Sequence, residues 1–237
     1  NQNYGGGHSH CDAMIYLGDR WPVEYRGTLL TSNIHGRRVN RDRLVRHSGV
    51  YRGEHADDFL VADDPWFRAV SMECGPDGDV YVTDWSDNGE CHDRDGVHRT
   101  SGRIYKITWG KPRLVTVNLQ TASNEQLVKY QLHASDWYVR HARRILQERS
   151  IAGQDMTNAH AELRGLFENT PDVPRKLRAM WTLYVSGGAD ESWLVSLLSH
   201  QNEHVRSWAV RLLADGQSPS NATLQHFSRM AESENSW

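Results

Sequence analysis

The chain has little of several features that would identify its class at once. Its 237 residues include three cysteines, Cys11, Cys74 and Cys91, and none has the C-x-x-C spacing of a zinc site or a haem attachment sequence. No apolar run approaches the roughly 20 residues that a membrane-spanning helix needs. The 27 Lys and Arg residues nearly balance the 30 Asp and Glu residues. This balance argues against nucleic acid or an acidic lipid surface as the main partner.

The chain also lacks an initiator methionine and a signal-peptide pattern. It opens on Asn1-Gln2-Asn3 and ends on Ser236-Trp237, without a recognisable closing motif. We therefore expect a piece of a longer protein, for which missing targeting signals say little about location.

The first part of the sequence has the short strands and turns of an all-β structure. Turn signals such as Gly18-Asp19, Pro76-Asp77-Gly78 and Ser101-Gly102 separate segments of alternating apolar character. Gly78 suits the positive φ that such a turn tends to need. Strands at this spacing favour a sandwich, a barrel or a propeller. The predicted strands are 13–17, 28–33, 39–46, 51–60, 69–74, 79–84 and 103–108.

The pattern becomes helical after Gly110-Lys111-Pro112. In 202–213 the apolar residues fall at i, i+3, i+4, i+7 and i+8, which places them on one face of a helix that Asn202 caps. In 136–146, Asp136 is the expected cap. Ser123 and Gln126 have the spacing of a capping box. The predicted helices are 124–134, 136–146, 155–167, 173–186, 191–200 and 202–213.

These helices form pairs whose second members begin near 136, 173 and 202. The spacing of roughly 30 to 37 residues is typical of stacked helical-pair repeats. Two second helices open with D/N-x-x-V-R, and the second of these, at 202–209, has the full D/N-x-x-V-R-x-x-A pattern, an opening that resembles HEAT repeats. We therefore divide the chain into an all-β part, 1–110, and an all-α solenoid of HEAT or armadillo type, 111–237.

A long polar segment follows the strand at 79–84. Eighteen residues separate this strand from the next, far more than the two to five of a usual hairpin loop, and such loops are often functional. Two interpretations are open: a wall of a binding pocket, or a surface loop held by ion pairs. Asp93-Arg94-Asp95-Gly96 is not an EF-hand, because Ile104 stands where the twelfth-position carboxylate is required. Another kind of calcium site stays open.

Two further clusters carry alternative interpretations. The first is a cluster near the start of the chain: His8, His10, Cys11 and His35. These residues either form a metal site or are histidines that make ordinary hydrogen bonds. The second is a basic strand that contains Arg37, Arg38, Arg41, Arg43 and Arg46. Its arginines either bind a carboxylate or phosphate ligand, or lie on a solvated edge strand.

Several motifs together resemble a known family. HCDAMIYLGDRWPVEYRGTLLTSNIHGRRVNRDRL, 10–44, resembles the late blades of the soluble quinoprotein glucose/sorbosone dehydrogenase-like propeller. FRAVSMECGPDGDVYVTDW, 67–85, and SGRIYKI, 101–107, resemble the next blade. With helical repeats behind them, they are similar to the large membrane-bound dehydrogenase-type, haem-binding proteins of planctomycetes. The resemblance is good over about 8–150 and extends to the helical tail only at the level of repeats.

The resemblance implies that 1–110 forms C-terminal blades of a six-bladed propeller. Relatives hold pyrroloquinoline quinone (PQQ) over the central channel, often with calcium, and pass electrons from a sugar or alcohol to a c-type haem domain. The catalytic histidine and the haem domain lie outside this chain, so we expect the chain alone to be inactive. Matching late-blade positions give the cofactor-binding candidates Arg68, Asp84, His92, Arg99 and Arg103.

Two classes of function follow. The first is part of a quinoprotein-type dehydrogenase in a periplasmic or other extracytoplasmic setting, with membrane association through the parent protein. The second is a non-catalytic scaffold that binds a carbohydrate, or a protein partner on the helical repeats. Cys11 and Cys91 could pair in such a setting, but sequence does not show it.

Overall fold

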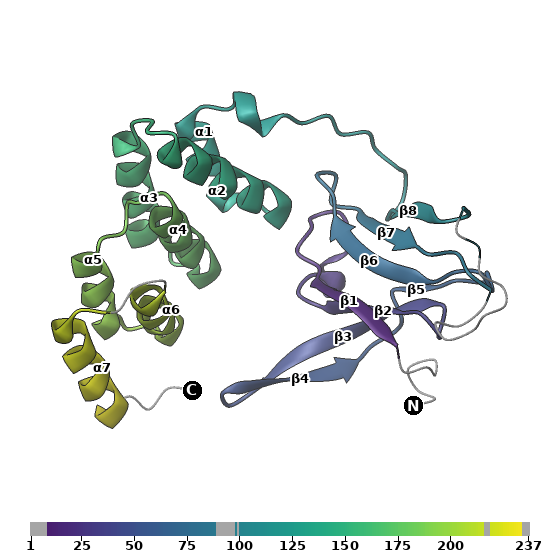
Figure 1. Cartoon of the computed structure of the whole chain (residues 1–237), viewed down its shortest axis with the longest axis horizontal. Coiled ribbons are helices and arrows are strands. Elements are labelled where there is room, and N and C mark those ends of the chain that lie inside the picture. The colour runs from purple at the N-terminus through teal and green to yellow at the C-terminus, as the bar shows by residue number, and fades with distance from the viewer. Residues whose placement is uncertain (1–8, 89–97, 99, 216–218, 234–237) are drawn as a thin grey trace. The chain divides into compact units, whose positions relative to one another are not determined.

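The computed structural model describes residues 9–88, 98, 100–215 and 219–233 (Figure 1). Contacts divide the chain into two compact units. The sheet unit comprises Asn1–Val117 with Ala134–Trp137, and the helical unit comprises Asn118–His133 with Tyr138–Trp237. Within the described ranges, no helix combines the length and the apolar character that a membrane crossing requires.

The sheet unit holds two antiparallel sheets, as the alternating pattern predicts. In the first sheet the strand order is β1-β2-β3-β4, and the short β5 also pairs with β3. In the second sheet the order is β6-β7-β8. Neither sheet closes on itself among the described residues. The strands are β1 His10–Ile15, β2 Leu29–Asn33, β3 Arg38–His47, β4 Val50–His55, β5 Leu60–Val61, β6 Ala69–Cys74, β7 Val80–Asp84 and β8 Arg103–Ile107.

One predicted strand, 51–60, is two strands in the structure. β4 pairs with the Asp42–His47 half of β3, and β5 pairs with Arg38 and Val39. Between them the backbone N–H groups of Ala56 and Phe59 donate to the carbonyls of Arg41 and Val39. This detour buries the Phe59 ring in the core and leaves the Asp57 side chain exposed.

The β3–β4 hairpin extends past the rest of its sheet (Figure 1). β2 pairs with Arg38–Asp42 only, whereas β4 pairs with Asp42–His47. The turn between His47 and Val50 contains Ser48 at φ 51° and Gly49, a left-handed conformation that two-residue hairpin turns favour. The outer half of β3 therefore has one neighbouring strand, β4.

The core of the sheet unit lies where the two sheets pack together. Alternate residues of β7 point inward, so Val80, Val82 and Asp84 are buried while Thr83 is exposed. A bulge in β1 leaves Asp12 at φ 41°. Its carboxylate oxygen Oδ2 accepts the Met72 N–H of β6 at 2.6 Å. The buried apolar residues of this core are Tyr16, Leu30, Val39, Phe59, Phe67, Ala69, Met72, Val80 and Val82.

Tyr16 connects the two sheets through its hydroxyl group. The side chain is fully buried, and Oη donates to the Gly78 carbonyl at 2.7 Å. The same oxygen accepts the backbone N–H groups of Arg20 at 3.2 Å and Trp21 at 3.1 Å. Gly18 must be glycine here, because a Cβ would lie 2.5 Å from the Tyr16 oxygen. Gly78 has φ +78°, which confirms the turn conformation expected from the sequence.

The helical unit contains seven α-helices in its described part. Six of them match the predicted helices, and the seventh, Asn221–Ser233, was not predicted. The capping box of Ser123 with Gln126 and the Asn202 cap are both confirmed. The helices are α1 Asn124–Lys129, α2 Asp136–Ile151, α3 Thr157–Asn169, α4 Val173–Val185, α5 Glu191–Ser196, α6 Glu203–Ala214 and α7 Asn221–Ser233.

We predict that Tyr16→Phe destabilises the sheet unit by about 1–3 kcal/mol, because two backbone N–H groups and the buried Gly78 carbonyl lose their partner. Hydrogen exchange of peptides from β1 and β7 measures this unit separately from the helices. Tyr51→Phe is the matched control, since Tyr51 is 63% exposed and its hydroxyl has no partner among the described residues. Equal exchange in both variants would show that the Tyr16 hydroxyl contributes nothing.

Candidate functional site

Asp84 is the last residue of β7, and its side chain points into the core just before the long polar segment begins. Because its side chain is fully buried, its charge needs partners. Oδ1 accepts the backbone N–H groups of Arg68 at 2.7 Å and Ser86 at 2.9 Å. Oδ2 accepts Arg103 Nε at 2.8 Å and lies 2.6 Å from Arg103 Nη2. Both carboxylate oxygens are thus engaged by protein donors.

Arg103 joins Asp84 to a second carboxylate. Its Nη1 lies 2.9 Å from Asp64 Oδ2, and 36% of each of these two side chains is exposed. The Trp66 N–H donates to Asp64 Oδ1 at 2.8 Å. The hydrogen bond from Trp66 is the largest cause of the lowered pKa of Asp64; burial opposes it, and the hydrogen bond from Arg103 lowers the pKa further. The guanidinium therefore holds β8 against the segment that precedes β6.

Arg68 fastens the start of the polar segment from the other side. Its buried guanidinium donates through Nη1 to the carbonyls of Pro65 and Phe67, both at 2.9 Å. Nη2 donates to the Asn88 carbonyl at 3.4 Å. The Arg68 carbonyl in turn accepts the Trp85 N–H at 2.9 Å. We call Asp64, Arg68, Asp84 and Arg103 the loop clamp.

The structure thus brings together three of the five residues that the resemblance selects: Arg68, Asp84 and Arg103. His92 and Arg99 lie outside the described residues. Within the described part, these three residues hold the base of the loop through hydrogen bonds and ion pairs. This agrees with the interpretation of the segment as a surface loop held by ion pairs. Their role in cofactor binding stays a prediction.

The other predicted clusters have simpler outcomes. No group of three or more His, Cys, Asp or Glu side chains with metal-binding geometry occurs among the described residues. His8, Cys91 and Asp93–Gly96 lie outside those residues, so a calcium site stays a prediction. Cys11 is a free cysteine in the structure, so the Cys11–Cys91 pair is not formed there. Burial, with Asp19 adding to it, raises the pKa of the Cys74 thiol to about 12.

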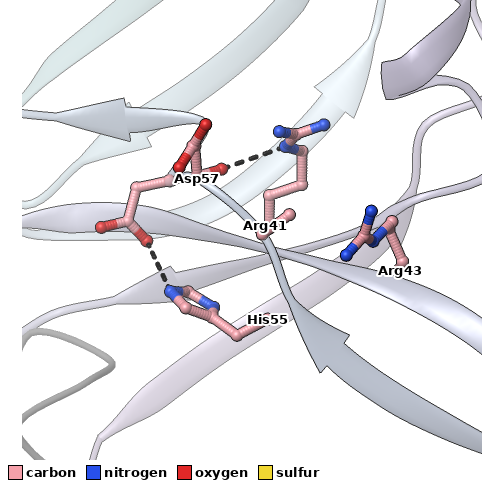
Figure 2. Close-up of a pocket in the computed structure, with 6 residues that line it drawn as sticks. Arg41, Arg43, His55 and Asp57 are labelled. Atoms are coloured by element: carbon pink, nitrogen blue, oxygen red, sulfur yellow. Dashed lines mark hydrogen bonds and ion pairs between the residues drawn. The ribbon is translucent and has the colours of Figure 1, made fainter.

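An open pocket lies beside the middle of β3 (Figure 2). Its volume is about 520 Å³, and every lining residue except Ala56 carries a charged or titratable side chain. The lining residues are Arg41, Arg43, His55, Ala56, Asp57 and Asp58. We call this the Arg41 pocket. Two of its members, Arg41 and Arg43, belong to the basic strand that the sequence singled out.

Arg41 forms a fixed wall of the pocket. Its Nε donates to the Asp57 carbonyl at 3.0 Å (Figure 2). Its Nη1 donates to the Glu24 carbonyl at 3.2 Å. Its Cζ lies 4.3 Å from the centroid of the Tyr25 ring, in a cation–π contact. The side chain is therefore held by three contacts before any ligand arrives.

His55 lies between two carboxylates. Its Nδ1 is 3.5 Å from Asp42 Oδ1. Its Nε2 is 3.8 Å from Asp58 Oδ1, the ion pair drawn at His55 in Figure 2. Asp58 is held in turn by Arg38 Nη1 at 2.6 Å and Asn40 Nδ2 at 2.7 Å. The imidazole and its neighbours form a connected polar network on this side of the pocket.

Arg43 and Asp57 differ from the other charged residues of the pocket. Both are exposed, and neither side chain makes a hydrogen bond or ion pair within the described part of the chain. The pocket thus offers one guanidinium and one carboxylate that are unpartnered there. Sequence reasoning missed His55 and Asp57, because 51–60 reads as a strand. The signal was the polar run Glu54-His55-Ala56-Asp57-Asp58, since Asp is depleted in strands.

We predict a coupling free energy of about 1–3 kcal/mol between Asp84 and Arg103, because the carboxylate is buried and its charge is largely compensated by this guanidinium. A double-mutant cycle with Asp84→Asn and Arg103→Gln measures it through urea unfolding followed by hydrogen exchange of β7 and β8 peptides. Asp63→Asn is the control, since Asp63 is exposed and unpartnered among the described residues; we expect a change below about 0.5 kcal/mol. Additive single effects would refute the loop clamp.

Parts of the chain are similar to a protein family and to a solved structure. Residues 1–111 match a family model described as a domain of unknown function (DUF7133). No curated protein matches the chain significantly. Among solved structures, a proposed oxidoreductase (glucose dehydrogenase) from Thermus thermophilus is similar at 26% identity and a TM-score of 0.26. The match covers 35% of this chain and 22% of that structure, so this chain spans about a fifth of its length. A TM-score this low defines neither the fold nor the activity of this chain.

Proposed function

We propose that the sheet unit binds an acidic sugar, or a related polyol with a carboxylate, in the Arg41 pocket. The observation that carries this proposal is a pair of side chains, Arg43 and Asp57, that have no partner among the described residues and lie beside the fixed guanidinium of Arg41. An arginine fork matches a carboxylate in two parallel hydrogen bonds. The Asp57 carboxylate accepts hydrogen bonds from hydroxyl groups.

The charges of the pocket favour this ligand class over two others. An apolar ligand would remove water from Arg43 and Asp57 without giving their charges a partner, which costs free energy. A simple multivalent anion would face the carboxylates of Asp57 and Asp58 as well as the arginines. A ligand with one negative group and several hydroxyls satisfies both kinds of lining residue.

We predict that Arg43→Ala weakens binding of glucuronate on the order of tenfold, because the bidentate contact to the carboxylate is lost. Calorimetric titration of the full chain with glucuronate and with glucose measures this. Arg52→Ala is the control, since Arg52 is exposed on the same hairpin but does not line the pocket. Equal affinity for glucose and glucuronate, or equal loss in both variants, would overturn the proposal.

For the parent protein we propose a quinoprotein-type dehydrogenase that acts on a sugar or alcohol. The motifs of 10–44, 67–85 and 101–107 support it, and they favour late blades of a six-bladed propeller followed by HEAT-like repeats. In this proposal PQQ supplies the hydride acceptor, often with calcium, and a separate c-type haem domain takes the electrons. The same proposal places the parent protein in the periplasm or another extracytoplasmic space, as the resemblance implies.

The loop clamp bears on where a quinone would bind. The guanidinium groups of Arg68 and Arg103 already donate to Asp84, Asp64 and backbone carbonyls. A quinone would have to compete with these acceptors for the same donors. This competition is the observation behind a second candidate function, a non-catalytic scaffold that binds a carbohydrate through the Arg41 pocket.

We predict that the intact parent, loaded with PQQ and calcium, reduces its haem when an oxidisable sugar or alcohol is added. Haem absorbance follows the reaction, and Arg103→Gln is expected to lower the rate if the loop clamp lies near the quinone. Asp63→Asn serves as the control. Binding of sugar without PQQ binding or haem reduction would instead establish the scaffold.

A further inference from the structure

The second helices of the helical pairs carry an excess of positive charge. Basic Arg and Lys residues number four in α2, three in α4 and two in α6, against two, none and one acidic residues. The first helices α1, α3 and α5 carry one, one and no basic residues against one, two and one acidic residues. Within the helical unit, α2, α4 and α6 follow one another along one side (Figure 1). Charge is therefore segregated between the two layers of helices.

Four side chains on this basic side form a continuous series of contacts between guanidinium groups and indole rings. Arg143 of α2 lies with its Cζ 5.2 Å from the Trp181 ring centroid of α4. Trp181 meets Trp208 of α6 edge to face, at 4.8 Å and 65°. Arg211 of α6 lies with its Cζ 4.8 Å from the Trp208 centroid. We call this series the Arg–Trp ladder, and it joins three successive second helices.

The ladder presents guanidinium groups rather than open rings. Each indole has an arginine against it and the other indole beside it, so neither is a free stacking surface for a sugar or a base. An arginine that packs on a ring still has its N–H donors in the guanidinium plane. Arg143 Nε lies 3.4 Å from Thr182 Oγ1, which fixes that side chain. Arg211 is exposed, and its guanidinium makes no hydrogen bond or ion pair within the described residues.

We propose that the Arg–Trp ladder is a docking surface for an acidic, extended peptide segment of a partner protein. Carboxylates complement the excess charge of α2, α4 and α6, and their two oxygens match the guanidinium fork. Tryptophan and arginine are also the residues that most often dominate protein–protein binding energy. An extended segment advances ~3.3 Å per residue, so acidic side chains roughly four residues apart reach both ends of the ladder.

The test uses the full chain and a fluorescent polyglutamate peptide, with binding followed by fluorescence anisotropy. We expect binding that weakens as salt is raised, because surface charge attraction is screened. The double variant Arg143→Ala/Arg211→Ala is expected to weaken it on the order of tenfold. Circular dichroism of the helical signal confirms that the variant is folded.

Arg144→Ala is the matched control. Arg144 is exposed on α2, outside the ladder, and pairs with Glu148 in its own helix at 3.2 Å. Equal weakening in the control and the double variant would overturn the proposal, because only net charge would then matter. Binding of heparin or a DNA oligonucleotide in preference to polyglutamate would also overturn it, since a polyanion of another class would be the occupant.

Discussion

The sheet unit depends on one buried hydroxyl group. The Tyr16 hydroxyl oxygen accepts hydrogen bonds from two backbone N–H groups of the segment after β1. The hydroxyl donates to the carbonyl of Gly78, in the turn that precedes β7. It therefore fixes the first sheet against the second at a place where the chain is irregular and cannot satisfy its own backbone groups. The glycines at 18 and 78 are consequences of this contact, since one gives the ring space and the other gives the turn its left-handed conformation.

Charged groups in this unit have two distinct kinds of environment. In the loop clamp, Asp84 is buried and its carboxylate is engaged by Arg68 and Arg103, so its charge serves the fold. In the Arg41 pocket, Arg43 and Asp57 are exposed, and their side chains are unpartnered in the described structure. Burial, rather than residue type, thus separates charges that hold the scaffold from charges that are available to a ligand.

Sequence reasoning succeeded where a short pattern is enough to determine local structure. The alternation in β7, the glycine turn before it and the caps of α1 and α6 depend on neighbouring residues alone. It failed at 51–60, where pairing with two different parts of β3 breaks one apparent strand into two. For the same reason it found Arg41 and Arg43 but not His55 and Asp57. The grouping of Asp64 with Arg103 also depends on long-range packing, which no local spacing encodes.

The overhanging β3–β4 hairpin has a consequence for local opening of the fold. Its outer half is a two-stranded ribbon, and an isolated ribbon of this kind is only marginally stable in water. Its amides should therefore exchange with solvent through small openings that leave the core intact. Arg43 belongs to this ribbon, whereas Asp57 follows it and is tied to the body of the sheet through Ala56 and Phe59. A ligand that bridges Arg43 and Asp57 would favour the closed ribbon, so occupancy of the pocket and order of the hairpin are thermodynamically linked.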